Sequence, residues 1–294
     1  MTSQKYRNLT FRFLTSPIRN LFFFLKLHPT SGEYITGDGF RKIANHIYDE
    51  NSKINIEKIK INDIIFVKSN LIDKYFQDIH PFIQVKYKLI THNSDKNIGE
   101  REVKYIDDKI IKWFAQNVEM EHPKLIPIPI GIENKKYFYN GIPYIFNKIK
   151  NTKTTKKDKI IFGFNIMTNP QERQSAFSEL INNNVVEQIN GFPNPYNYIK
   201  ILNQYKFVAS PPGNGIDCHR TWEAMYLNVI PIVKHSVMTE YFKNLGLPLW
   251  IINDWKELDG LTENDLSDKY EDIMTNSKTE PLFMNYWKEK INNI

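Results

Sequence analysis

The stretch SPPGNGIDCHRTWEAMYLNVIPIV, from Ser210 to Val233, has the pattern of a strand end, a turn, a helix and a second strand. Its turn contains Gly213 and Gly215, which allow a sharp turn and a close approach of the backbone to a ligand. A strand, a turn, a helix and a strand in this order predict a parallel βαβ unit. The stretch therefore predicts both a fold class and a place where a ligand binds.

The same alternation occurs on both sides of a polar, basic segment at residues 147–158. Before it, the short β-rich runs EYIT, DIIFVK and YKLITHN each precede a longer periodic run, the last of them DDKIIKWFAQNV. After it, KIIFGFN, VVEQI, YKFVAS and LPLWII are predicted strands separated by helical runs. Two such halves predict an α/β chain with two Rossmann-like domains that face each other across a cleft. We expect domains at 1–148 and 149–277, with a helix at 278–294 that packs back on the first domain.

Composition narrows the classes of protein that fit. The 294 residues are 41% hydrophobic and 24% charged, which is ordinary for a globular protein. The net charge of +6 is spread through a chain rich in Lys, Asn and Ile, and no compact basic run with interleaved aromatics appears, so nucleic-acid binding is not expected. One cysteine leaves no internal disulfide and fits a reducing compartment.

The longest apolar run near the N-terminus is LFFFLKL, at Leu21–Leu27. It is far shorter than the roughly 20 residues that a membrane-spanning helix needs, and no signal-peptide pattern follows it. We therefore expect a cytoplasmic protein in which this run is a buried strand or helix. A peripheral membrane contact is the alternative interpretation.

Ligands of open parallel sheets bind beyond the carboxyl ends of the strands, so the loops there are candidates for chemistry. In this chain these loops are polar or contain glycine. They include Gly37–Gly39, His92–Asp95, Thr168–Asn169, Gly213–Gly215 and Lys234–Ser236.

The helix after Gly215 presents groups that suit a nucleotide. Asp217 is the expected N-cap, and the helix start favours phosphate. Arg220 suits a bidentate contact to a diphosphate, and Glu223, three residues on, lies on the same helix face and suits both hydroxyls of a ribose. Arg173 and Arg220 are the arginines that follow Arg101, in a lysine-rich half of the chain, which supports a need for a planar guanidinium at this edge.

Other ligand motifs are weaker. Cys218 and His219 are adjacent and lack partners at metal-binding spacing, so no metal site is expected. The glycines of both loops lack the third glycine of a dinucleotide fingerprint, and no P-loop or Asp-x-Asp motif occurs. A diphosphate site that needs no metal remains.

The segment KFVASPPGNGIDCHRTWEAMYLNVIPIV resembles the nucleotide-sugar region of exostosin-like glycosyltransferases. Their pattern is a Ser-Pro-x-Gly-x-Gly turn, an Arg, a Trp/Phe-Glu-Ala run and a Val/Ile-Pro-Val/Ile strand. LITHNSD, WFAQNV and HPKLIPIPIGIEN extend the resemblance over most of the chain between about Tyr34 and Trp255. Asn228 replaces the usual Gly, and Asn tolerates the left-handed conformation there. The chain is also shorter than exostosins proper, so the acceptor does not carry over.

The resemblance implies a GT-B fold and a hexosyl or pentosyl transferase, usually inverting, with a nucleotide-sugar as substrate and a glycan hydroxyl as acceptor. We expect a UDP-sugar, with a GDP-sugar as alternative, and no required cofactor. The expected donor-site residues are Arg173, Ser210, Gly213, Asn214, Gly215, Asp217, Arg220, Glu223 and Lys234. The first domain should supply the base, with Asp95 as first candidate and Asp38 and His92 as runners-up. The alternatives are a noncatalytic nucleotide- or glycan-binding module and a nucleotide-sugar epimerase of similar fold.

Overall fold

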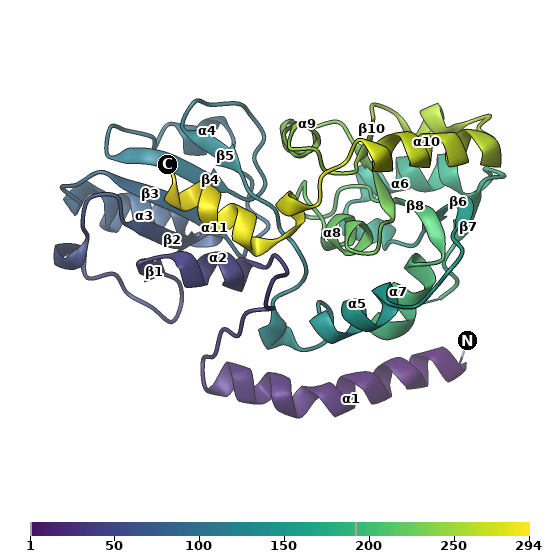
Figure 1. Ribbon diagram of the computed structural model, residues 1–294. Helices are drawn as coiled ribbons and strands as arrows, with labels where there is room; N and C mark the ends of the chain where they lie inside the picture. The colour runs from purple at the N-terminus through teal and green to yellow at the C-terminus, as the bar shows by residue number, and fades with distance from the viewer. Residues whose placement is uncertain (1, 192) are drawn as a thin grey trace.

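Two five-stranded parallel sheets organise the chain, one in each half of the sequence (Figure 1). The structure is a computed structural model that describes residues 2–191 and 193–294, with side chains from Phe13 onward. The first sheet has the order β1-β2-β3-β4-β5 and the second β10-β9-β8-β6-β7. Their strands are β1 His46–Tyr48, β2 Ile64–Lys68, β3 Tyr87–His92, β4 Ile110–Ala115, β5 Leu125–Pro127, β6 Lys157–Phe162, β7 Val186–Gln188, β8 Tyr205–Ala209, β9 Ile230–Lys234 and β10 Trp250–Ile252.

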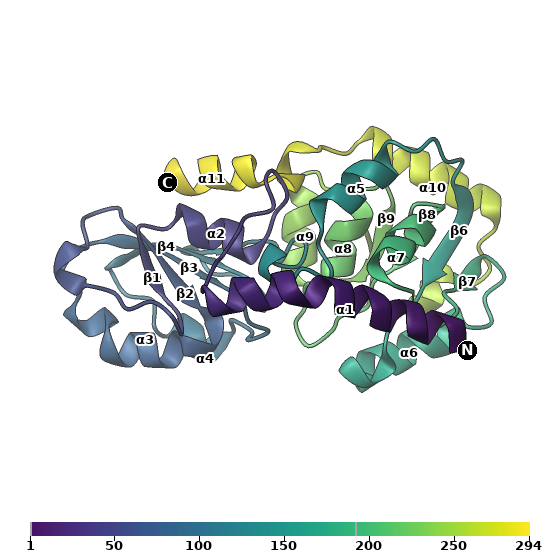
Figure 2. The same cartoon turned by 90° about the horizontal axis from the view of Figure 1, so that it is seen from below.

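Helices cover both sheets, as parallel sheets require (Figures 1 and 2). The α-helices are α1 Thr2–Phe24, α2 Gly37–Ile43, α3 Ile72–Asp78, α4 Glu100–Val103, α5 Pro143–Lys150, α6 Pro170–Leu180, α7 Pro195–Leu202, α8 His219–Met225, α9 Val237–Asn244, α10 Glu263–Thr275 and α11 Met284–Asn292. Short 3-10 helices are η1 Ile56–Lys58, η2 Ser69–Leu71, η3 His80–Phe82, η4 Lys135–Tyr137, η5 Ile166–Thr168, η6 Trp255–Leu258 and η7 Glu280–Leu282. The predicted α/β class with two Rossmann-like halves is confirmed by these two parallel sheets.

The chain crosses between its two halves more than once. The C-terminal helix α11 lies against α2 beside the first sheet (Figure 1). Lys88 of β3 is buried and donates from Nζ to the carbonyls of Ile291 at 2.9 Å and Asn292 at 3.2 Å, which satisfies the end of that helix. Near the other end of the chain, the backbone N–H of Ile35 donates to the Tyr226 hydroxyl at 3.1 Å. The domain boundaries at 148/149 and 277/278 stay a prediction.

Two local predictions were wrong. EYIT is no strand, because Tyr34 forms an isolated bridge to Phe283 while Ile35 contacts the second half of the chain. DDKIIKWFAQNV contains strand β4 instead of a helix. A parallel strand that is covered on both faces has a continuous apolar run, and its pattern does not separate it from a buried helix.

The expectation that Leu21–Leu27 is buried was also wrong. Leu21, Phe23 and Phe24 lie at the end of α1, and each exposes half or more of its surface. Within residues 2–191 and 193–294, no helix has the length and hydropathy needed to cross a bilayer. Figure 1 shows α1 running beneath α5 and α7 along the outside of the molecule, and in Figure 2, which is seen from below, it crosses in front of that domain.

Candidate functional site

Two cavities meet where the two domains face each other. The first has a volume of about 420 Å³ and is lined mainly by loops of the first domain. The second has a volume of about 350 Å³ and is lined mainly by the loop after β8 and by the start of α8. Asp95, Ile130 and His219 line both, so the two cavities are adjacent. A ligand group in one cavity can therefore lie next to a group in the other.

The glycine-bearing loop reaches across to the first domain. A Cβ on Gly215 would lie 2.5 Å from Nδ2 of Asn117, which a side chain at this position does not tolerate. Asn117 follows β4 and accepts from the backbone N–H of Asp217 at 3.2 Å through Oδ1. Asn214, between the glycines, donates to Asp95 Oδ2 at 3.1 Å. The loop is thus held from the opposite side of the cleft.

Asp217 does not have the predicted capping role. The N-cap of α8 is Cys218, and no side chain caps it. The Asp217 carboxylate instead accepts from Trp222 Nε1 at 2.9 and 2.8 Å and from the backbone N–H of Ile130 at 2.8 Å. Burial raises the pKa of Asp217 to about 6, against these hydrogen bonds. Because Trp222 and Ile130 are far apart in the sequence, the carboxylate joins the two domains.

The two arginines lie together at the second cavity. Arg173, on α6, donates from Nε to the Pro212 carbonyl and from Nη1 to the Asn165 carbonyl, both at 2.9 Å. The guanidinium carbons of Arg173 and Arg220 each lie 5.8 Å from the ring centre of Phe164. Burial lowers the pKa of Arg173, and the charge of Arg220 lowers it further. These contacts bring two like charges to one wall.

Arg220 keeps unused hydrogen-bonding capacity. Its Nη2 donates to the Gly163 carbonyl at 3.2 Å, while Nε and Nη1 are buried and have no hydrogen-bond partner among the described residues. Among all the described residues, the arginines that form ion pairs are Arg41 and Arg101. Arg173 and Arg220 therefore have no carboxylate partner among these residues. Unpaired buried charges are costly, which indicates a site for an anion.

Glu223 lies one turn further along α8 and also lines the second cavity. Burial raises the pKa of this carboxyl, whereas the charges of His219 and Arg220 act in the opposite direction. The side chain is therefore close to His219 and Arg220 without forming an ion pair with either among the described residues. A carboxylate in this position can accept two hydroxyl hydrogens.

Two expected donor-site residues lie elsewhere. Ser210 is buried, with Oγ 2.9 Å from Oγ1 of Thr221, and Lys234 contacts the carbonyl of Asn253 through Nζ. Both line a third, smaller cavity behind the loop instead of the second cavity. The structure therefore does not bring Ser210 and Lys234 to the arginines.

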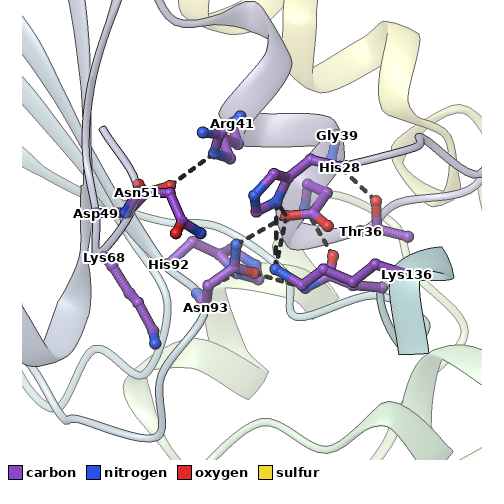
Figure 3. A network of polar contacts seen from close by, with 12 residues as sticks. His28, Thr36, Gly39, Arg41, Asp49, Asn51, Lys68, His92, Asn93 and Lys136 are labelled. Atoms are coloured by element: carbon purple, nitrogen blue, oxygen red, sulfur yellow. Dashed lines mark hydrogen bonds and ion pairs between the residues drawn. The ribbon is translucent and has the colours of Figure 1, made fainter. Parts of the chain in front are cut away.

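The three candidate bases occupy different surroundings. Asp95 is exposed, follows β3 and lines both cavities. Asp38 is buried in the network of Figure 3, where His28 Nδ1 lies 3.0 Å, Asn93 Nδ2 3.2 Å and Lys136 Nζ 3.5 Å from its Oδ1. Burial would raise the pKa of Asp38, but the contacts to His28 and Lys136 outweigh it and the pKa is lowered. This carboxylate is stabilised in its charged form and is a weak base.

His92, beside Asn93 in Figure 3, uses both ring nitrogens within the protein. Its Nδ1 accepts from the backbone N–H of Asn93 at 2.7 Å, so Nε2 carries the hydrogen that is donated to the Pro129 carbonyl at 3.0 Å. Burial lowers the pKa of His92 to about 4. This histidine is held neutral, and neither nitrogen is free to take a proton from a substrate.

The sequence interpretation rejected His219 as a metal ligand and gave it no other role. His219 begins α8, lines both cavities and lies with Nδ1 2.7 Å from the Gly131 carbonyl. A carbonyl accepts only, so Nδ1 donates and Nε2 is the nitrogen able to accept. Its position beside Arg220 in the quoted stretch was the available signal. Among the described residues, no cluster of three or more His, Cys, Asp or Glu side chains is arranged to hold a metal ion.

Comparison with known proteins finds only a distant structural similarity. The sequence matches no family model, and no curated protein is similar enough to be identified as a relative. A UDP-forming alpha,alpha-trehalose-phosphate synthase from Burkholderia xenovorans has a TM-score of 0.45 and 11% identity over 80% of this chain and 73% of its own. The corresponding enzyme from Burkholderia vietnamiensis has a TM-score of 0.43 and 7% identity over 79% and 70%. Substrates do not transfer between proteins at this distance, and the exostosin-like resemblance stays a prediction.

Proposed function

We propose that this protein is an inverting, metal-independent glycosyltransferase that binds a nucleotide-sugar in the second cavity and a glycan hydroxyl in the first. The observation that carries the proposal is the pair Arg173 and Arg220, which face one cavity and form no ion pair with a carboxylate of residues 2–191 or 193–294. Two free hydrogen-bonding nitrogens of Arg220 add directional capacity for an oxyanion. The diphosphate of a nucleotide-sugar supplies the charge and the acceptor oxygens that this wall lacks.

The placement of the nucleotide follows from the groups around the arginines. With the diphosphate on Arg173 and Arg220, Glu223 is one helical turn away and accepts from the ribose hydroxyls. The helix α8 has seven residues, so its dipole adds little, and the arginines provide most of the electrostatic attraction. A UDP-sugar is the preferred donor, with a GDP-sugar as the second choice.

The reaction needs charge stabilisation on one side and a base on the other. As the bond from the anomeric carbon to the phosphate oxygen breaks, negative charge grows on the diphosphate, where the arginines lie. The acceptor hydroxyl attacks from the first cavity and loses its proton to a base there. Asp95 suits this role best of the three candidates, because it lines both cavities, whereas Asp38 and His92 are committed to contacts within the protein. His219 Nε2 is the alternative base.

The decisive experiment is nucleotide binding by calorimetry to the wild type and to Arg220→Met. Loss of charge-assisted hydrogen bonds should weaken UDP binding by about 10- to 100-fold. Arg101→Met is the matched control, because Arg101 is exposed and lines neither cavity, and its replacement removes the same charge. Equal UDP affinity in wild type and Arg220→Met would contradict the donor site.

Transfer itself is tested with a panel of UDP- and GDP-sugars. A transferase should release nucleotide slowly without an acceptor, and Arg220→Met should abolish this release. Binding without release of nucleotide would favour a noncatalytic binding module. Conversion of one nucleotide-sugar into another without an acceptor would favour an epimerase.

A further inference from the structure

The long N-terminal helix α1 carries an apolar face that the rest of the described chain leaves uncovered. Its exposed apolar residues recur at helical spacing and form one stripe, here named the α1 stripe. It consists of Phe13, Leu14, Ile18, Leu21 and Phe24, together with Leu25 in the turn that directly follows the helix. Phe13 is 77% and Phe24 83% exposed, although folded proteins usually bury such side chains. The stripe is continuous over three turns, so it is a surface and not a set of scattered side chains.

The other side of the helix attaches to the body of the protein. Phe22 meets Phe138 with ring centres 6.2 Å apart, and Phe23 meets Tyr137 at 5.6 Å. Figures 1 and 2 show α1 along the outer edge of the molecule, with its last turn near the junction of the domains. The helix is therefore anchored at one end while the α1 stripe stays exposed.

The charge of this segment has one sign. The first acidic residue of the chain is Glu33, whereas residues 1–32 contain five Lys and Arg residues, among them Arg19 and Lys26. Arg19 is half-buried on the side of α1 away from the stripe, and Lys26 is exposed in the turn that follows the helix. An exposed apolar face on a basic helical segment that contains no acidic residue is typical of helices that lie in the plane of a membrane surface.

We propose that α1 docks this protein on an anionic lipid bilayer, with the α1 stripe between the acyl chains and the basic residues of the segment near the headgroups. The charge selects this occupant, because anionic lipids attract an acid-free basic segment, whereas a second copy of the same helix would bring like charges together. The helix is too polar to span, so it binds at the surface. The helix diameter is about one Debye length, so basic residues on any side of the segment still sense the lipid charge.

Docking through α1 would bring the first cavity to the bilayer. Tyr137, which Phe23 contacts, lines that cavity, and His28 just after α1 contacts Asp38 in the network next to it. The orientation of α1 on a membrane thus fixes where the cavity opens. The docking itself does not depend on the proposed transferase activity.

Co-sedimentation with vesicles of 70% phosphatidylcholine and 30% phosphatidylserine tests the proposal without nucleotide or acceptor. The wild type should bind, and binding should be much weaker to pure phosphatidylcholine and at high salt. The triple variant Leu14→Glu/Leu21→Glu/Phe24→Glu should lose at least about tenfold in partitioning. Arg19→Gln/Lys26→Gln, which keeps the stripe, should lose about threefold to anionic vesicles.

The matched control introduces the same changes elsewhere. Ile61→Glu/Phe82→Glu/Ile181→Glu also replaces three exposed apolar residues, all outside α1, and should bind vesicles as the wild type does. Circular dichroism and UDP binding verify that the stripe variant stays folded. Absent vesicle binding by the wild type, or equal binding by the wild type and the stripe variant, would overturn the proposal. So would a wild-type dimer that the stripe variant converts to a monomer without a change in vesicle binding, since the stripe would then be a self-association face.

Discussion

Asn214 Nδ2 donates to Asp95 Oδ2 at 3.1 Å, and this contact joins the loop after β8 to the loop after β3 across the cleft. One partner stands in the loop that we assign to the donor, and the other is the proposed base. The contact therefore links the position of the base to the loop that holds the nucleotide. It also leaves Oδ1 of Asp95 available for a substrate hydroxyl.

Asp95→Asn should abolish transfer while UDP binding stays unchanged, because the amide keeps the size of the side chain but takes no proton. Asn214→Ala should lower the transfer rate by about tenfold through loss of the hydrogen bond that orients Asp95. Rates are measured with saturating donor, and binding by calorimetry. Full activity of Asp95→Asn together with an inactive His219→Ala would move the role of the base to His219.

Glu223→Gln should weaken UDP binding by about tenfold, since the amide accepts one ribose hydroxyl less well than the carboxylate accepts two. Burial raises the pKa of Glu223, so its carboxylate becomes protonated at a higher pH than that of an ordinary glutamate. The affinity of the wild type for UDP should therefore decrease as the pH is lowered through that higher pKa. Calorimetry with UDP from pH 5 to pH 8 measures both. If the variant showed the same pH dependence as the wild type, another group would be responsible. Removal of one ribose hydroxyl from UDP should reduce the affinity of Glu223→Gln less than it reduces the affinity of the wild type.

Gly215→Ala should destabilise the junction of the domains, because the new Cβ would lie 2.5 Å from Asn117 Nδ2 and displace a side chain that accepts from Asp217. We expect a lower unfolding temperature and weaker UDP binding. Asn117→Ala/Gly215→Ala removes the clash and should recover part of the stability that the single glycine variant loses. Additive losses in the double variant would contradict the proposed contact.

Stability should fall with acid in a window set by His92. Its pKa is about 4 in the folded protein and about 6.5 when unfolded, so the unfolded chain binds the extra proton between these values. The contribution of neutral His92 to the free energy of unfolding is thus complete above pH 6.5 and is lost as the pH falls to 4. The largest loss of free energy of unfolding is about 3 kcal/mol. Urea unfolding across this range should show a shallower loss in His92→Gln. His235→Gln, at an exposed histidine, is the control.

Treatment with EDTA should leave transfer unchanged, because Arg173 and Arg220 supply the positive charge that a divalent ion supplies in metal-dependent transferases. The assay compares initial rates before and after chelation and dialysis. Loss of activity that Mg²⁺ or Mn²⁺ restores would contradict this prediction.

Much of the fold could be predicted because it depends on patterns between close neighbours in the sequence. Strand, turn and helix signals located β8, α8 and β9, and the expected left-handed residue at Asn228 has a φ of 54°. The same reasoning failed at β4. This strand is covered on both faces, so its sequence lacks the alternation of apolar and polar residues that distinguishes a strand from a helix. It also failed for Asp217, because the carboxylate finds better partners in Trp222 and Ile130 than at the helix start.

The sequence by itself determined the two α/β halves, the glycine loop and the placement of Arg220 and Glu223 on one helix face, since these depend on spacing along the chain. The tertiary structure decided that Arg173 and Arg220 share a wall and form no ion pair among the described residues, that Asp95 meets Asn214, and that the α1 stripe is exposed. These relationships join residues from different elements. Packing of the two domains sets them, and no local pattern contains that information.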